Sequence, residues 1–375
     1  MIKGEKSISN GKSALICAER LGNSLHQAWQ ARRYQPGDDQ QIDALLKACL
    51  PAYQGPEKWE WIHRNNPLGF HGPDGDIWVA EDQEGTLVGY YSRIRYAMHC
   101  FGKIVLASQA LNMTTHPHFR RQGIAAALME ASIRDARSNG IKITFGFPNK
   151  LSYPLAIKEG AIDSGSAGYM KLVLDPVGYS QSLQSGPVWK LLRRTQLTAL
   201  GALRHKPGPV PTKFEVVRGF SDDAGSVEET VLRGFDLGLA RTEQYLSWRY
   251  DSRWGPYESY SLVHDGSCSG YVVTWNGKRG DIGVSRILEL MARDDDTETY
   301  EALLSVALQR AKERNSTYVA VASTGSESEL RYLRRSGFGI VKLSGRYVFV
   351  PYDSDIGAKL VGARAYLSLG DRDYL

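Results

Sequence analysis

The sequence predicts an α/β (α+β) fold made of two units that repeat one order of helices and strands. Its 375 residues, at roughly 150 per domain, favour two domains. Three prolines within residues 207–211 interrupt any helix or central strand and divide the chain. Three markers recur in the same order on both sides of that break: a tryptophan, a Gly-x-x-x-Gly turn and a helix-ending glycine (Trp61, Gly85/Gly89, Gly160; Trp248, Gly266/Gly270, Gly337).

In the first unit, apolar spacing and turn residues predict elements in a regular order. Helices are expected at 42–50 and 59–63, and strands at 77–80, 87–96 and 104–113. A longer helix begins at Ile124, with apolar residues at helical spacing, and ends at Gly140 as a left-handed cap would end it. A strand at 141–147 and a short helix at 153–158 complete the unit.

The second unit is expected to repeat this order. One helix is expected to contain Trp248, and two others to span 297–314 and 327–335. Strands are expected around Gly266 and Gly270 and at 286–291, 318–322 and 346–351. The predicted division of the chain is an N-terminal extension (1–34), a first unit (35–180), a helical linker (181–211), a second unit (212–352) and a C-terminal tail (353–375).

Residues 188–204 of the linker predict a basic amphipathic helix. One mainly apolar stripe of this helix consists of Trp189, Leu192, Gln196, Leu200 and Leu203. Three cations lie beside the stripe: Lys190, Arg193 and Arg194. A linker helix docked on a domain and a helix lying on a membrane surface both fit this pattern.

The composition excludes several classes of protein. With 42% hydrophobic and 23% charged residues, the chain is too apolar to be disordered. A net charge of +5 suits an anionic ligand but is too weak to predict a nucleic-acid partner. The four cysteines form no CxxC pair, which argues against a zinc site or a disulfide framework and for a reducing compartment (Cys17, Cys49, Cys100 and Cys268).

No segment of the sequence predicts a membrane span. The apolar run at residues 14–18 is too short for a signal peptide, and no run approaches 18 apolar residues. We therefore expect a cytoplasmic protein without stable membrane insertion.

The segment 115–125, Thr-His-Pro-His-Phe-Arg-Arg-Gln-Gly-Ile-Ala, predicts an anion site where a strand meets a helix. The first amides of a helix have no intrahelical partner, and the helix dipole places partial positive charge there. Gly123 allows the backbone to approach a phosphate closely, and the small side chains of Ala125 and Ala126 do not obstruct this approach. Arg120 and Arg121 add hydrogen-bond donors suited to phosphate. This best suits a pyrophosphate with a long tail; the dinucleotide and P-loop fingerprints do not fit. A tight strand-to-helix turn without a ligand is the alternative.

This segment resembles motif A of the Gcn5-related N-acetyltransferase (GNAT) superfamily. The pattern Gln/Arg-x-x-Gly-x-Gly/Ala is matched by Arg120, Gly123 and Ala125. The family's next landmark, an asparagine after the following strand, is matched by Asn149, with Ser152 where a small residue is expected. The resemblance covers roughly residues 35–175.

The resemblance implies two mixed, mostly antiparallel sheets flanked by helices, with a splayed cleft for CoA in the first. The cosubstrate would be acetyl-CoA or another acyl-CoA, and a primary amine would attack its thioester directly. The implied cofactor-binding residues are Met113, Thr114, Thr115, Arg120, Arg121, Gln122, Gly123, Ile124, Ala125, Ala126, Asn149 and Ser152.

The residues that would carry catalysis depart from the family's pattern. The family often has a tyrosine seven residues after the asparagine, but Ala156 stands there, so Tyr153 is the candidate acid. A buried tyrosine with a satisfied hydroxyl is the alternative. The strand before motif A has no carboxylate, and Asn112 can orient water without accepting a proton. A site without a base favours an amine of lower pKa than lysine, such as an amino sugar or amino acid.

The second unit is expected to have lost CoA binding and to form a wall of the acceptor site. Asp294, Asp295 and Asp296 stand where motif A would be, and they would repel a pyrophosphate. Candidate wall residues, each with a structural alternative, are Trp248, Arg249, Tyr250, Trp254 and Glu289. The tail at 370–374 is expected either to fold back into the cleft or to fray.

The arrangement also resembles tandem-GNAT sugar N-acyltransferases of surface-polysaccharide pathways. This resemblance implies a nucleotide-linked amino sugar as the acceptor. The segment 61–67, the run Phe147-Pro148-Asn149 with Tyr153-Pro154, and the closing Gly-Asp-Arg-Asp carry it. Two other functions stay open: aminoacyl transfer from tRNA onto a peptide or lipid headgroup, and acyl-CoA binding without catalysis.

Overall fold

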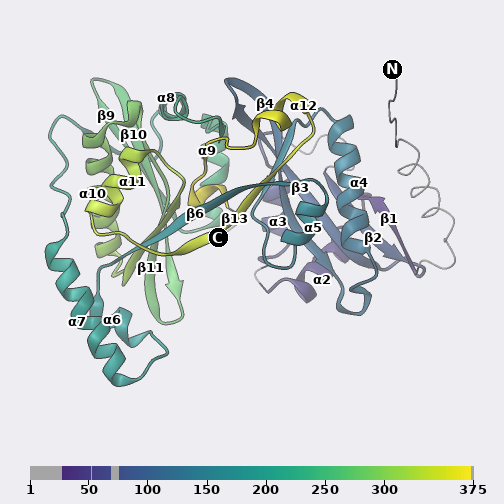
Figure 1. Ribbon diagram of the computed structural model, residues 1–375, viewed down its shortest axis with the longest axis horizontal. Helices are drawn as coiled ribbons and strands as arrows, with labels where there is room; N and C mark the ends of the chain where they lie inside the picture. The colour runs from purple at the N-terminus through teal and green to yellow at the C-terminus, as the bar shows by residue number, and fades with distance from the viewer. Residues whose placement is uncertain (1–27, 52, 69–75, 373–375) are drawn as a thin grey trace, which may run out of the picture.

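The computed structural model describes residues 28–51, 53–68 and 76–372. In this part of the chain, fourteen strands join into one sheet that runs through the whole molecule. Figure 1 shows the first half of the chain, purple to blue, beside the green second half. The short apolar run at 14–18, Cys17 and residues 373–375 lie outside the described residues.

The first half confirms the predicted order of elements; the strands predicted at 77–80, 87–96 and 104–113 run longer than expected, and the one predicted at 141–147 is shorter. Its strands are β1 (Trp29–Arg33), β2 (Ile77–Asp82), β3 (Leu87–Cys100), β4 (Lys103–Thr115) and β5 (Ile143–Gly146). Its helices are α2 (Asp39–Cys49), α3 (Pro56–His63), α4 (Ile124–Ser138) and α5 (Tyr153–Lys158). Strand β1 falls within the segment 1–34 and pairs with β2, so the sheet begins before residue 35.

The second half follows the same order. Its main elements are α9 (Glu243–Arg249), β9 (Tyr257–His264), β10 (Ser267–Arg279), β11 (Ile282–Ala292), α10 (Thr297–Glu313), β12 (Tyr318–Ser323) and α11 (Glu327–Arg335). Smaller elements were not predicted: α6 (Pro176–Gln181), β7 (Glu215–Arg218), α8 (Val227–Leu232), β8 (Leu237–Leu239), α12 (Ser354–Lys359) and β14 (Ala365–Tyr366). The linker helix α7 (Pro187–Leu203) is present as predicted.

Two long strands cross between the halves, as Figure 1 shows at its centre. Strand β13 (Gly339–Pro351), late in the sequence, pairs with β5 of the first half. Strand β6 (Ile162–Val173) pairs with β13 on one side and with β12 of the second half on the other. Each half thus contributes a strand to the sheet of the other, and neither half forms its sheet alone.

The two tryptophans that mark the repeat lie against each other where the halves meet. Their ring centroids are 5.2 Å apart. The Trp61 indole N–H donates to the Trp248 carbonyl at 3.2 Å, and the Trp248 indole N–H donates to the Trp61 carbonyl at 3.0 Å. Both rings are buried. Each half therefore satisfies a buried polar group of the other, which fixes how the halves pack.

We expect Trp61→Phe to destabilise the protein by about 1–3 kcal/mol, because it removes one buried hydrogen bond and leaves a void. Urea denaturation would measure the free energy of unfolding. Trp189→Phe is the matched control: Trp189 is 70% exposed, so its change should stay within about 0.5 kcal/mol. Equal effects of the two substitutions would contradict the structural role of Trp61.

Candidate functional site

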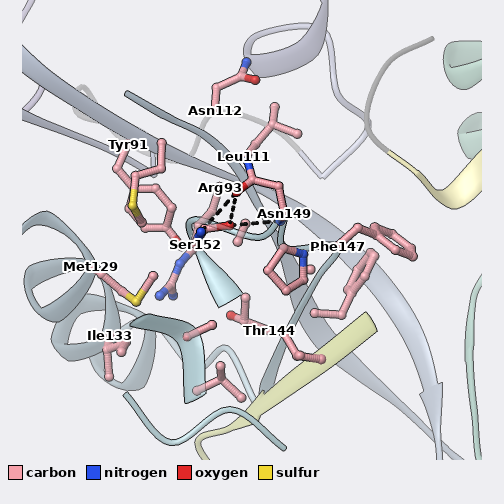
Figure 2. A pocket seen from close by; sticks show the side chains of 18 of the residues that line it. Tyr91, Arg93, Leu111, Asn112, Met129, Ile133, Thr144, Phe147, Asn149 and Ser152 are labelled. Atoms are coloured by element: carbon pink, nitrogen blue, oxygen red, sulfur yellow. Dashed lines mark hydrogen bonds between the residues drawn. The ribbon is translucent and has the colours of Figure 1, made fainter. Parts of the chain in front are cut away.

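A cavity of about 240 Å³ opens where β4 and β5 separate. The two strands pair in parallel from Ala107↔Ile143 to Gln109↔Phe145, and their pairing ends there. Strands β3 and β13 and helices α4 and α5 also contribute to its walls, so the cavity lies between these helices and the sheet (Figure 2). A cleft at this position is what the sequence predicted for a CoA thioester.

A β-bulge shapes the β4 wall of the cavity. Between the pairs Ser92↔Leu111 and Tyr90↔Thr114, β4 has one residue more than β3. Asn112 takes up this extra length with a φ of 49°, a left-handed conformation that asparagine tolerates better than most residues. Asn112 and Met113 both line the cavity. The bulge leaves backbone groups at the site free of regular pairing with β3.

The predicted anion loop precedes α4. Arg121 has a φ of 64° and Gly123 a φ of 87°, so two left-handed residues bend the chain into the helix. The amides of residues 121–126 donate no backbone hydrogen bond outside the helix within the described structure. The Arg120 Nε donates to the Thr115 carbonyl at 3.3 Å, which holds the loop against the end of β4. Successive free amides at a helix N-terminus form a concave site that fits a pyrophosphate.

Asn149 and Ser152 lie together at the mouth of the cavity, as Figure 2 shows. The Asn149 Oδ1 accepts from the amides of Leu151 and Ser152 at 2.8 and 3.0 Å, and so holds the turn that precedes α5. The amide nitrogen of its side chain remains available to a ligand. Thr114, on β4, has a buried hydroxyl without a partner among the described residues. These groups can meet the polar pantetheine arm of CoA.

The structure does not bring Tyr153 into the cavity. Its hydroxyl donates to Asp163 on β6 at 2.6 Å, and Arg346 pairs with the same carboxylate. This hydrogen bond to Asp163 is the main reason that the pKa of Tyr153 is raised. Ala156 lines the cavity instead. The position that holds a tyrosine in the family therefore faces the site, and the tyrosine of this chain faces away from it.

The candidate wall residues of the second half form a buried network and do not line the cavity. Glu289 accepts from the Tyr250 hydroxyl at 2.6 Å and pairs with Arg241 at 3.1 Å. Arg241 also pairs with Asp371 at 2.9 Å, and the Arg249 Nη2 donates to the Gly370 carbonyl at 2.9 Å. The tail is thus folded back through Arg372, which resolves the alternative of fraying for residues 370–372.

The folded tail fills the counterpart of the cavity in the second half. Strands β11 and β12 pair in parallel only from Val284↔Tyr318 to Ile287↔Val321. Beyond that point, Ser368 bridges to Ser323, and the Thr324 amide donates to the Leu367 carbonyl at 2.9 Å. The second cleft is therefore closed by the chain itself.

Sequence reasoning missed residues that reach the site from other strands. Arg93 and Tyr91 come from β3, while Val348 and Val350 come from β13, followed by Tyr352. A long-range contact also joins β4 to the tail, since the Gln109 Nε2 donates to the Asp371 carbonyl at 3.1 Å. Local sequence patterns carry no signal for such contacts. The only indication in the sequence that β3 reaches the site was the presence of arginine, including Arg93, within the otherwise apolar strand predicted at 87–96.

Comparison with known proteins matches residues 30–160 to the family described as "Acetyltransferase (GNAT) domain". No curated protein matches the sequence. The fold is similar to a GCN5-related N-acetyltransferase from Anabaena variabilis (13% identity, 88% of this chain and 74% of that one, TM-score 0.60). It is also similar to a conserved Enterococcus faecalis protein of unknown function, a probable N-acyltransferase (12% identity, 88% and 74%, TM-score 0.61). A third similar structure is Saccharomyces cerevisiae N-myristoyltransferase with bound myristoyl-CoA (13% identity, 87% and 79%, TM-score 0.57).

At these identities the structural likeness establishes the fold, and the family match covers residues 30–160 of the 375. This match supports an acyltransferase enzyme that uses an acyl-CoA as its cosubstrate. No helix among the described residues is long and apolar enough to cross a membrane.

Gly123→Ala should weaken CoA binding on the order of 10-fold or more, because alanine disfavours the φ of 87° that turns the loop amides together. Isothermal titration calorimetry with CoA would measure this change in affinity. Gly140→Ala is the matched control: Gly140 has a φ of 73°, and an added Cβ meets no atom within 4 Å at either position. Both variants should lose about 1 kcal/mol of stability, and only Gly123→Ala should lose affinity. Unchanged CoA binding by Gly123→Ala would contradict the loop's role.

Proposed function

We propose that the protein transfers an acyl group from acyl-CoA to the primary amine of a small molecule. The observation that carries this proposal is the open separation of β4 and β5 beside an amide-lined helix N-terminus. In this arrangement the amides of residues 121–126 hold the pyrophosphate. The free edge of β4 at Met113, Thr114 and Thr115 pairs with the pantetheine arm, and Asn149 contacts it.

The reaction proceeds by direct attack. The amine nitrogen bonds to the thioester carbon, the C–S bond breaks, and the CoA thiolate leaves with the proton that the amine loses. Backbone amides at the β4 bulge, near Asn112, are placed to polarise the thioester oxygen. Holding the two reactants together supplies much of the remaining acceleration.

The cavity favours an acceptor that needs little help to lose a proton. The described residues that line it include no aspartate or glutamate, and Tyr153 is engaged with Asp163. An amine with a pKa near 8 is substantially neutral at physiological pH, whereas a lysine amine is not. A nucleotide-linked amino sugar fits this requirement, and Arg372, whose guanidinium lies 5.2 Å from the Phe147 ring centre, offers a cation for its diphosphate.

We further propose that the two halves arose as copies of one domain and that the second has become a supporting wall. The reciprocal Trp61–Trp248 hydrogen bonds and the exchange of β6 and β13 support this view. The predicted units 35–180 and 212–352 are then joined by a linker at 181–211 and followed by a tail at 353–375, with the first unit extended to include β1 at Trp29–Arg33. A cytoplasmic location would give the enzyme direct access to acyl-CoA.

The test is a transfer assay with acetyl-CoA over a panel of amines that spans amino sugars, nucleotide amino sugars, amino acids and lysine peptides. Release of CoA thiol and mass spectrometry of the product would measure the rate. We expect turnover to favour amines of low pKa and to rise with pH until the amine is neutral. Measurable CoA binding without any product would instead favour acyl-CoA binding without catalysis. Product formed only from aminoacyl-tRNA would favour the aminoacyl-transferase alternative.

A further inference from the structure

The cavity continues past the CoA mouth to a buried end beneath α4. Met129 and Ile133 of α4 cover this end, and Val350 forms part of its floor. Ile133 lies nine residues after Ile124, or about 14 Å along the helix axis from the anion loop. The buried end is therefore well separated from the predicted pyrophosphate position, on the side where an acyl group could extend.

Arg93 brings a positive charge to this buried end. It is 2% exposed, and its Nη2 donates to the Ser132 hydroxyl at 2.8 Å. Its Nε and Nη1 are buried without a hydrogen-bond partner among the described residues, and no carboxylate there forms an ion pair with it. The neighbouring carboxylate of Asp76 is taken by Arg95. Figure 2 shows the Arg93 guanidinium extending between Met129 and Thr144.

A buried cation without a counter-ion is costly, and proteins normally pair such groups. The rings of Trp78, Tyr91 and Tyr352, with centres 5.5 to 5.9 Å from the Arg93 Cζ, compensate only part of this cost. The Tyr352 hydroxyl is itself buried without a partner among the described residues. An anion in the cavity would satisfy both groups at once.

We propose that Arg93 binds the terminal carboxylate of the acyl group, so that the preferred donor is the CoA thioester of a short dicarboxylic acid. This inference rests on the proposed acyl transfer. The apolar walls match a methylene chain, and the guanidinium at the end matches a carboxylate. The acyl carboxylate supplies the negative charge that the cavity lacks.

The test compares donors of equal chain length that differ only in the terminal group: succinyl-CoA against butyryl-CoA, and glutaryl-CoA against pentanoyl-CoA. Isothermal titration needs no acceptor and measures each affinity directly. We expect the wild-type protein to bind the dicarboxylic thioesters tighter by on the order of 10-fold to 100-fold. Arg93→Met should abolish that preference while binding of free CoA is kept. Ser132→Ala, which removes the one hydrogen bond of Arg93 and keeps its charge, should retain the preference.

Equal affinity of the wild-type protein for the paired donors would overturn the inference, and this result does not depend on how any variant folds. A preference that persists in Arg93→Met would also overturn it. Failure to bind CoA or any thioester would instead refute the proposed function, so the two failures are distinguishable.

A second inference rests on a separate observation, the exposed apolar face of α7. Figure 1 shows α6 and α7 projecting from the second half. Helix α7 contacts α6, and none of its residues is buried. Six of its seven large apolar side chains are 55% to 84% exposed, and Leu197 is partly buried (Val188, Trp189, Leu191, Leu192, Leu200 and Leu203 are the exposed ones).

The charged side chains in the segment that contains this face are all positive, although Lys213 at its end pairs with Glu298 of α10. No aspartate or glutamate occurs in residues 176–214, and the same segment holds six cations (Lys190, Arg193, Arg194, Arg204, Lys206 and Lys213). Trp189, Leu192, Leu200 and Leu203 fall within about 120° of arc at 3.6 residues per turn, and Lys190 and Arg194 lie opposite them. An exposed apolar stripe beside unbalanced positive charge complements an anionic lipid surface.

We infer that α7 lies in the headgroup region of an anionic membrane and holds the enzyme there reversibly. Co-sedimentation with vesicles of phosphatidylcholine alone, and of phosphatidylcholine with 30% phosphatidylglycerol, tests this on the full chain. Binding is expected on the anionic vesicles and should weaken as salt rises. Trp189→Glu combined with Leu192→Glu should abolish it. Ile104→Glu is the control, because Ile104 is 58% exposed but lies on β4.

Absence of binding to the anionic vesicles would overturn this inference, as would unchanged binding by the α7 variant. Sedimentation velocity tests the competing occupant, a second copy of the chain. A dimer that the α7 substitutions dissociate, in the absence of lipid binding, would assign the face to self-association and reject the membrane.

Discussion

Strand β13 is the element on which both the sheet and the cavity depend. It pairs with β5 from Val348↔Gly146 to Pro351↔Ile143, and its side chains Val348 and Val350 face the cavity. These two strands come from different halves of the chain, so the entropy of closing the long intervening loop opposes their pairing until the second half is in place. The site of the first half is thus completed by the second, and the whole chain is the functional unit.

The two clefts illustrate how one arrangement of strands can hold either a ligand or the chain itself. Between β4 and β5 the space is a cavity, and the Nε and Nη1 of Arg93, which lines it, lack hydrogen-bond partners among the described residues. Between β11 and β12, Ser368 and Leu367 satisfy the backbone and Thr324, and Asp371 pairs with buried Arg241. The first cleft is therefore open to a ligand, whereas the tail occupies the second.

Local order was predictable from the sequence, and long-range pairing was not. Helix α4 and its loop were found because apolar spacing and an Arg-x-x-Gly-x-Ala run are local signals. Strand β6 was missed because its first half, Ile-Asp-Ser-Gly-Ser-Ala-Gly, lacks apolar alternation and is held by neighbours on both sides. Tyr153 was placed near the site by its distance along the chain from Asn149, but Asp163 and Arg346 draw its hydroxyl elsewhere. Partners from distant strands decide such orientations.

The described cavity wall contains no carboxylate and includes the cation Arg93. This combination affects the charge of both reactants. When the bound acyl group carries no carboxylate, the charge of Arg93 disfavours a second positive charge and so lowers the pKa of an amine that enters the cavity, whereas a carboxylate bound to Arg93 cancels this effect. The same field favours the negative charge that develops on the thioester oxygen during attack. Burial strengthens both effects, since little water remains to screen the guanidinium. A site of this kind can promote attack by a neutral amine although the site supplies no general base. The electrostatic environment of the cavity then selects the acceptor amine as much as the shape of the cavity does.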